Sequence, residues 1–191
     1  MHIGLVLAAV PAYSETFFVN KIRFLQEAGA RVTVFADQRN VISFDGCPVV
    51  YGMGLERNGE LGWLAFWRVV LSMIRVPGKA LQLWKKNKQS GFSSKKNLIS
   101  LIGSLHILPQ KPDWLHFGFG TLAIGREHLA SVVGAKMAVS FRGFDIAIYP
   151  LKHKACYKLL WSKVDKVHVI SDDLTKLVYA EGYSHDKVLT K

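Results

Sequence analysis

The sequence predicts an α/β fold: a Rossmann-like parallel sheet with helices on both faces. Three observations predict it. Residues 2–9 form a continuous apolar run, later apolar runs alternate with helix-length segments, and helix-capping residues follow several of these runs. Unbroken apolar runs are typical of strands buried on both faces, and their alternation with helices indicates parallel strands. A chain of 191 residues, 50% of them hydrophobic, suits a single such domain over 1–191.

The elements of the N-terminal part are expected in the order strand, helix, strand, strand. The first strand covers 2–9. Ser14 is expected to cap a helix over about 15–28, and Gly29 to end it. Further strands are expected over 31–36 and 47–51.

The stretch from about 60 to 105 differs in composition and is predicted to be helical, basic and aromatic. Between Leu61 and Pro112 the chain has nine Lys or Arg residues and no Asp or Glu, with breaks near Pro77 and Ser90. Such helices can lie on an anionic membrane surface, bind nucleic acid, or form an ordinary layer with a solvated basic face. The absence of acidic residues favours the membrane surface, and no nucleic-acid-binding motif is present, so nucleic acid is not expected as a partner.

The α/β alternation returns after Pro112. Strands are expected over 114–117, 135–141 and 166–170, and helices over about 121–133 and 151–163. Ser171 is expected to cap a last helix that has Asp172 and Asp173 in its first turn. Another strand begins at about 188, so the chain is expected to be cut from a longer fold.

Composition and motifs exclude several classes. The formal charge of +11 points to an anionic partner. Cys47 and Cys156 lie far apart and are expected to be reduced thiols of a cytoplasmic protein. No metal-ligand spacing, dinucleotide fingerprint, P-loop or esterase motif occurs, and no apolar stretch is long enough to cross a bilayer. Neither a metal nor a resident cofactor is therefore expected.

Candidate site residues follow the strands, because ligands of open α/β sheets bind beyond the carboxyl ends of the strands. Ser14 and Thr16 suit a phosphate or a sugar hydroxyl at a helix start, and His116 suits a hydroxyl. Arg142 can clamp an anion while Asp145 accepts hydroxyls. A helix cap, a hydrogen-bonded strand-end histidine and a structural Arg–Asp pair are the alternatives.

Four segments in this order resemble the N-terminal half of a family 4 (group 1) glycosyltransferase of the GT-B fold, similar to exopolysaccharide enzymes of the colanic acid type. The segments are Pro11-Ala12-Tyr13-Ser14-Glu15-Thr16-Phe17, His116-Phe117-Gly118, Phe141-Arg142-Gly143-Phe144-Asp145-Ile146 and Val169-Ile170-Ser171-Asp172-Asp173-Leu174.

The resemblance implies a retaining transfer of a sugar from a nucleotide-sugar donor to a polysaccharide or lipid-linked acceptor, without an essential metal. It implies catalytic roles for His116, Arg142 and Asp145. Arg142 stands where the family's His-Gly-x-Asp segment has histidine, which puts that histidine's contact with the transferred sugar in question. The substrate-binding residues that it implies are Ser14, Glu15, Thr16, Phe117, Gly118, Gly143 and Ser171.

The family's C-terminal donor-binding domain, with its paired glutamates, is absent from these 191 residues. The resemblance therefore implies a partner: that domain in a longer gene product, or a separate chain that completes a split enzyme. The isolated chain is expected to be inactive and to lie at the inner face of the cell membrane. The alternative is a non-catalytic module that binds a glycan, a lipid or a protein and keeps the half-fold.

Overall fold

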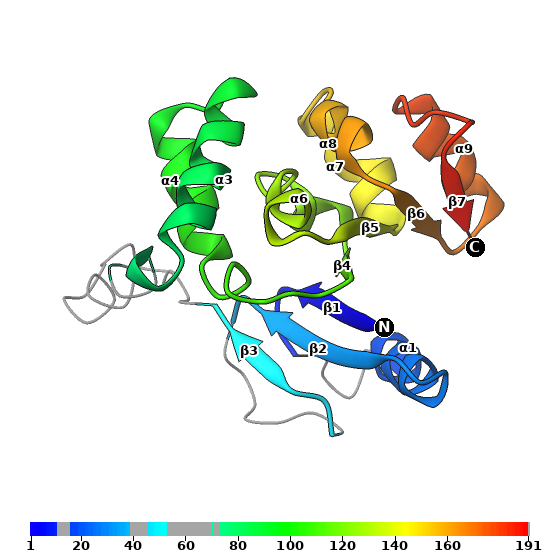
Figure 1. Cartoon of the computed structure of the whole chain (residues 1–191). Helices are drawn as coiled ribbons and strands as arrows, with labels where there is room; N and C mark the ends of the chain where they lie inside the picture. Colours follow the sequence, from blue (N-terminus) through cyan, green and yellow to red (C-terminus); the bar gives the residue numbers. More distant parts are fainter. Residues whose placement is uncertain (11–15, 39–45, 53–69, 71–72, 191) are drawn as a thin grey trace.

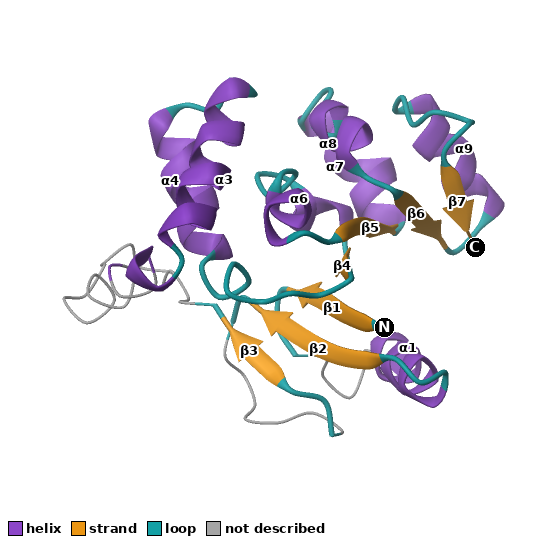
Figure 2. Ribbon diagram, in the orientation of Figure 1, coloured by secondary structure: helices purple, strands orange, loops and turns teal. Residues whose placement is uncertain are grey.

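The computed structural model describes residues 1–10, 16–38, 46–52, 70 and 73–190. Its seven strands form one parallel sheet in the order β3-β2-β1-β4-β5-β6-β7 (Figures 1 and 2). The strands are β1 (His2–Leu7), β2 (Arg31–Ala36), β3 (Val49–Tyr51), β4 (Trp114–Phe117), β5 (Lys136–Phe141), β6 (Lys166–Val169) and β7 (Val188–Thr190). The predicted Rossmann-like α/β fold is confirmed.

Helices pack on both faces of this sheet. They are α1 (Thr16–Glu27), α3 (Pro77–Gln89), α4 (Ser94–Ser104), α5 (Gly120–Ala123), α6 (Leu129–Val133), the π-helical turn η1 (Phe144–Ile148), α7 (Tyr149–Lys152), α8 (Lys158–Lys163) and α9 (Asp172–Ala180). Phe18 and Ile22 of α1 pack with Leu5 and Leu7 of β1. Val6, which alternates with them, belongs to the larger core formed with the later helices. Side-chain alternation thus separates the two layers.

The strand order places a change of direction beside β1. The chain runs from β1 outward to β2 and β3, then returns to pair β4 with the other side of β1. Loops that follow β1 and β4 diverge at such a switch point, and ligands of open α/β sheets bind there.

Two predicted helices are wrong in extent. The helix expected over 121–133 is split into α5 and α6, because Gly125 between them adopts a left-handed φ of 81°. The helix expected over 151–163 is divided into α7 and α8, and the residues before it form the helical turn η1 from Phe144 onward. Ala155, between α7 and α8, has a left-handed φ of 56°, so a regular helix does not continue through it, whereas Pro150 lies in the first turn of α7, where its missing N–H is not needed.

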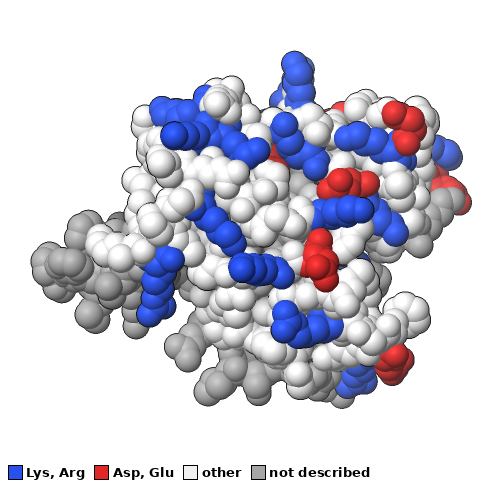
Figure 3. Space-filling model, viewed as in Figure 1, with Lys and Arg blue, Asp and Glu red and all other residues white. Residues whose placement is uncertain are grey.

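The helical hairpin of α3 and α4 occupies the basic-aromatic stretch, with breaks at the predicted places. Leu83 is fully buried and Trp84 packs against the larger core, whereas Leu81 and Leu98 are 54% and 47% exposed. Lys and Arg side chains gather over this hairpin (Figure 3). Residues 60–69, 71 and 72 of the stretch lie outside the described part. None of the described helices combines the length and apolar character that a membrane span requires.

Candidate functional site

A cavity of about 460 Å³ opens where the carboxyl ends of β2, β3 and β4 meet α4; we call it the edge pocket. Asp37 and Gln38 follow β2, Gly52 follows β3, and residues 121–126 follow β4. The remaining wall comes from α4. The pocket therefore lies at the carboxyl edge of the sheet, the edge at which open α/β sheets bind ligands, although no described residue of the loop after β1 lines it.

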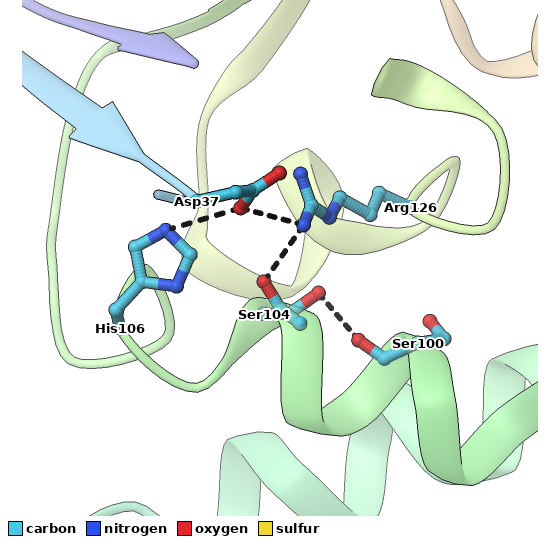
Figure 4. Close-up of polar contacts among 6 residues, drawn as sticks. Asp37, Ser100, Ser104, His106 and Arg126 are labelled. Carbon is cyan, nitrogen blue, oxygen red and sulfur yellow. Dashed lines mark hydrogen bonds and ion pairs between the residues drawn. The ribbon is translucent and has the colours of Figure 1, made fainter. Parts of the chain in front are cut away.

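An ion pair between Asp37 and Arg126 forms one wall of the edge pocket (Figure 4). Arg126 Nη2 donates to Asp37 Oδ1 at 2.8 Å and to the carbonyl of Gly103 at 3.0 Å. The two side chains are only 12% and 28% exposed. Arg126 Nη1 is buried without a hydrogen-bond partner among the described residues. The pair therefore gives the wall of the edge pocket polar atoms whose positions are fixed and which are largely shielded from water.

His106 stands behind this pair, with its Nε2 3.9 Å from Asp37 Oδ1 (Figure 4). Its side chain is 4% exposed and makes a T-shaped contact with Phe35. Burial, helped by the nearby Arg126 charge, lowers the pKa of His106 to about 3. The imidazole is consequently neutral at physiological pH and leaves the Asp37 charge to Arg126.

Buried hydrogen bonds hold α4 in its place beside the pocket. Ser100 Oγ donates to the carbonyl of Gly125, and Ser104 Oγ donates to the carbonyl of Ser100 at 2.7 Å (Figure 4). Asn87 Nδ2 of α3 donates to Asn97 Oδ1 and to Ser100 Oγ, both at 3.0 Å. The Ser100–Gly125 bond connects the hairpin to the loop after β4, and the Asn87 bonds join α3 to α4.

Asp145 ties the loops after β4 and β5 together. Its carboxylate accepts the N–H and hydroxyl of Thr121, both at 3.1 Å, and the backbone N–H of Arg142 at 3.3 Å. The residue is 1% exposed. Its backbone carbonyl accepts the hydroxyl of Tyr157 at 2.7 Å. Asp145 thus positions Thr121, which lines the edge pocket.

The Arg142 side chain lies on the other side of these loops, against α1. Its guanidinium carbon is 4.6, 4.6 and 4.9 Å from the ring centres of Phe17, Phe18 and Phe119. Nη2 is buried and has no hydrogen-bond partner among the described residues. Contact with three rings stabilises the cation, and the N–H groups on Nη2, which have no described partner, could bind an anion.

His116 lies within β4, on the sheet face that α1 adjoins, and not in the edge pocket. Its Nε2 is 3.2 Å from Lys21 Nζ and 2.9 Å from Ser140 Oγ, which in turn is 3.3 Å from His168 Nδ1. Burial and the Lys21 charge lower the pKa of His116 well below its ordinary value and that of His168 to about 4. Both rings are neutral hydrogen-bonding groups.

The other predicted residues have mainly local surroundings. A Cβ on Gly118 would lie 2.4 Å from Leu7 Cδ2 and 3.0 Å from the Phe18 ring, so glycine lets this loop pack closely on β1 and α1. Phe117 is a core residue, and Gly143 has open space around it. Ser171 caps α9 as predicted, accepting the N–H of Leu174 at 3.3 Å. Thr16 begins α1, whereas Ser14 and Glu15 lie outside the described residues.

The structure therefore brings Arg142 and His116 to the α1 side and turns Asp145 toward Thr121. Sequence reasoning missed Asp37, His106 and Arg126. An acidic residue directly after the second strand is the one signal that points to Asp37, since that position faces the ligand in many sheets of this topology. No protein-family model and no curated protein matches the chain.

Proposed function

We propose that the chain is the acceptor-side half of a retaining glycosyltransferase, which moves a sugar from a nucleotide-sugar donor to a polysaccharide or lipid-linked acceptor. The observation that carries the proposal is the edge pocket at the carboxyl ends of β2, β3 and β4. Its lining includes residues that follow β4, shortly after the His116-Phe117-Gly118 segment, and Thr121 of this lining is hydrogen-bonded to Asp145 of a second segment of the resemblance.

The lining of the edge pocket suits a polyhydroxylated acceptor. Asp37 and Arg126 offer fixed acceptor and donor atoms, and Gln38 adds an amide. Ile99 and Leu122 provide apolar surface for the carbon face of a sugar ring. A concave site with apolar walls and a few placed polar groups is typical of small-ligand binding.

The roles of the predicted residues follow from their surroundings. Arg142 lies against the first turn of α1, and its Nη2 has no partner among the described residues, so we assign it to the donor diphosphate, for which the resemblance also implies Ser14 and Thr16. Asp145 acts as a positioning residue through Thr121. His116 is a positioning residue as well, because its ring nitrogen contacts the Lys21 ammonium group and the Ser140 hydroxyl. A donor-binding half, in the same gene product or in a second chain, completes the enzyme.

The acceptor role is tested with two neighbouring substitutions on α4. Ile99 lines the edge pocket and is 50% exposed, whereas Leu98 is 47% exposed and does not line it. In Ile99→Arg the long side chain should fill the pocket and weaken the binding of methyl glycosides at least tenfold, measured by saturation-transfer NMR and calorimetry. Leu98→Arg should bind them like the unchanged chain. If the unchanged chain binds none of a panel of methyl hexosides, or both variants bind equally, the acceptor pocket is rejected.

The enzyme is distinguished from a non-catalytic module by its partner. The enzyme is supported if a neighbouring coding sequence encodes a second Rossmann-like half with paired glutamates. The product of that sequence must restore sugar transfer when it is mixed with this chain. Saccharide binding without any such partner or transfer supports the module instead.

The proposed location is the inner face of the cell membrane, with the α3–α4 hairpin against the lipid. Leu81, Leu98 and Ile99 are exposed there, next to Lys85 and Lys95. Basic residues beside exposed apolar ones are typical of interfacial helices. Helix α4 of this hairpin also lines the edge pocket, so a lipid-linked acceptor in the membrane would lie close to the pocket.

Vesicle sedimentation checks this location. The chain should bind vesicles that contain phosphatidylglycerol but not pure phosphatidylcholine, and binding should fall as salt is added, because salt screens the attraction. Replacing Lys85 and Lys95 with glutamate should reduce binding at least tenfold, whereas Lys158→Glu on α8 should not. Equal binding to both vesicle types, or none to either, would remove the membrane part of the proposal.

A further inference from the structure

One half of the sheet has a face on which no described helix packs. On this face the side chains of Trp114, His116, Ala138, Lys166 and His168 line a groove of about 700 Å³ beside α1. We call it the face groove. Their neighbours on the same strands, such as Leu115, Phe117 and Val167, point into the opposite core. No described residue fills this groove, so it has room for a ligand.

The face groove is positively charged. Lys21 and Lys166 line it, the Arg142 guanidinium stacks on Phe17 at its end, and no Asp or Glu is among the lining residues. Burial and the charges of Arg142 and Lys166 lower the pKa of Lys21 to about 8. Like charges held together in a partly desolvated place repel one another, and a bound anion would remove that repulsion.

Neutral hydrogen-bonding groups stand beside these charges. His116, Ser140 and His168 form a continuous chain of contacts that begins at Lys21 Nζ, with separations of 3.2, 2.9 and 3.3 Å. Phe17 also lies against His168, with ring centres 6.2 Å apart. An anionic headgroup at Lys21 would therefore be near the Lys166 ammonium group and the imidazole rings that line the groove, while Ser140 joins the two rings from the buried side.

The rest of the face groove is apolar. Phe24 is 69% exposed and Phe17 37% exposed, and both line the groove with Ile3, Leu25 and Trp114. Exposed aromatic rings in a concave surface favour an apolar ligand body. The groove thus combines a cationic end with an apolar wall.

We propose that the face groove binds an amphiphilic organic anion, with a phosphate or carboxylate headgroup at Lys21 and Lys166 and an alkyl or aromatic body along Phe24, Leu25 and Trp114. The size of the groove favours a small molecule over an acidic helix. A helix about 10 Å across that rises 1.5 Å per residue takes up about 120 Å³ per residue. The groove of about 700 Å³ would enclose less than two turns of it. The face groove is separate from the edge pocket, although Lys21 and His116, which line it, also have a role in the proposed sugar transfer.

Calorimetry with decyl phosphate, below its micelle concentration, tests the proposal. Decyl phosphate should bind at least tenfold more tightly than decanol, which lacks the charge, and than inorganic phosphate, which lacks the chain. Lys21→Met should weaken decyl phosphate binding at least tenfold, and Lys166→Met provides a second variant with the same expected loss. Lys163→Met, on the exposed side of α8, is the matched control and should bind normally.

NMR of the histidine rings locates the ligand. Decyl phosphate should shift the His116 and His168 signals and leave the exposed His153 unaffected. Three results would overturn the proposal: binding no tighter than that of decanol, equal binding by the Lys21→Met and Lys163→Met variants, or ring shifts confined to His153. An acidic amphipathic peptide that displaces decyl phosphate at lower concentration would assign the groove to a protein partner instead.

Discussion

Two apolar neighbours decide whether residue 118 can carry a side chain. A methyl group on Gly118 would lie 2.4 Å from Leu7 Cδ2, and both Leu7 and the nearby Phe18 are buried. Gly143, in the loop after β5, has a different environment. A Cβ built on it would have no atom within 4 Å, and its φ of −52° is accessible to any residue. The same residue type thus has a packing role at one position and none at the other.

We predict that Gly118→Ala destabilises the chain by about 2 kcal/mol, since overpacking a filled core typically costs about 1–3 kcal/mol. Gly143→Ala should be neutral or stabilising by about 0.5 kcal/mol, because alanine restricts the unfolded chain. Urea unfolding of both variants gives the comparison. Equal stabilities would mean that the loop after β4 moves freely away from Leu7.

At this scale the sequence predicts caps better than contacts. Ser171 was expected to cap α9 and does so, because a cap depends on residues three positions apart. The ion pair of Asp37 with Arg126 joins residues 89 positions apart, and no local pattern contains it.

Among the elements, the α3–α4 hairpin combines an exposed basic side with a buried polar seam. Asn87 and Asn97 are both fully buried and bonded to each other, and Asn97 Nδ2 also donates to the Trp84 carbonyl at 3.0 Å. Ser93 caps α4 by accepting the N–H of Lys96 at 3.2 Å. The seam orients α4, which in turn lines the edge pocket.

We predict that Asn87→Leu destabilises the chain by about 2 kcal/mol, because it leaves buried polar atoms of Asn97 and Ser100 without their donor. Hydrogen exchange should become faster in α4 before it does in β1. Lys85→Leu, on the exposed side of α3, should change stability by less than about 0.5 kcal/mol. A stable Asn87→Leu variant with unchanged exchange in α4 would contradict the role of the seam.

Helix continuity was the least predictable property of the elements. The sequence between β4 and β5 has helix-forming residues, but Gly125 turns the chain left-handed and ends α5 after Ala123. Glycine adopts such a conformation without steric cost, so whether it does so depends on the packing around it.

Over the whole molecule, buried neutral histidines connect stability to pH. The pKa of His106 is lowered to about 3 and that of His116 lies well below 6.5, mainly through burial. Below pH 6.5 the unfolded chain binds protons at these residues and the folded chain does not. Stability is therefore fully present above pH 6.5 and decreases as the pH falls from 6.5 toward 4.

We predict a loss of up to about 1.4 kcal/mol per pH unit for each such histidine, measured as the free energy of unfolding in urea between pH 7 and 4. His106→Leu should make the dependence of the unfolding free energy on pH less steep, by the contribution of one histidine. Stability that is constant over this range, or a profile that His106→Leu leaves unchanged, would show that His106 is protonated in the folded chain.

Alternating apolar runs and helical segments were sufficient to predict a Rossmann-like parallel sheet, since each run is read from residues close together in the chain. Most strand limits, the breaks of the α3–α4 hairpin and the cap of α9 follow from the same local patterns. Only the tertiary structure decided which loops share a pocket, because crossing from β3 to β4 brings Asp37 to Arg126 and leaves one sheet face open beside Lys21. Side-chain direction is set by packing between distant segments, and for that reason His116 faces α1 while Asp145 faces Thr121.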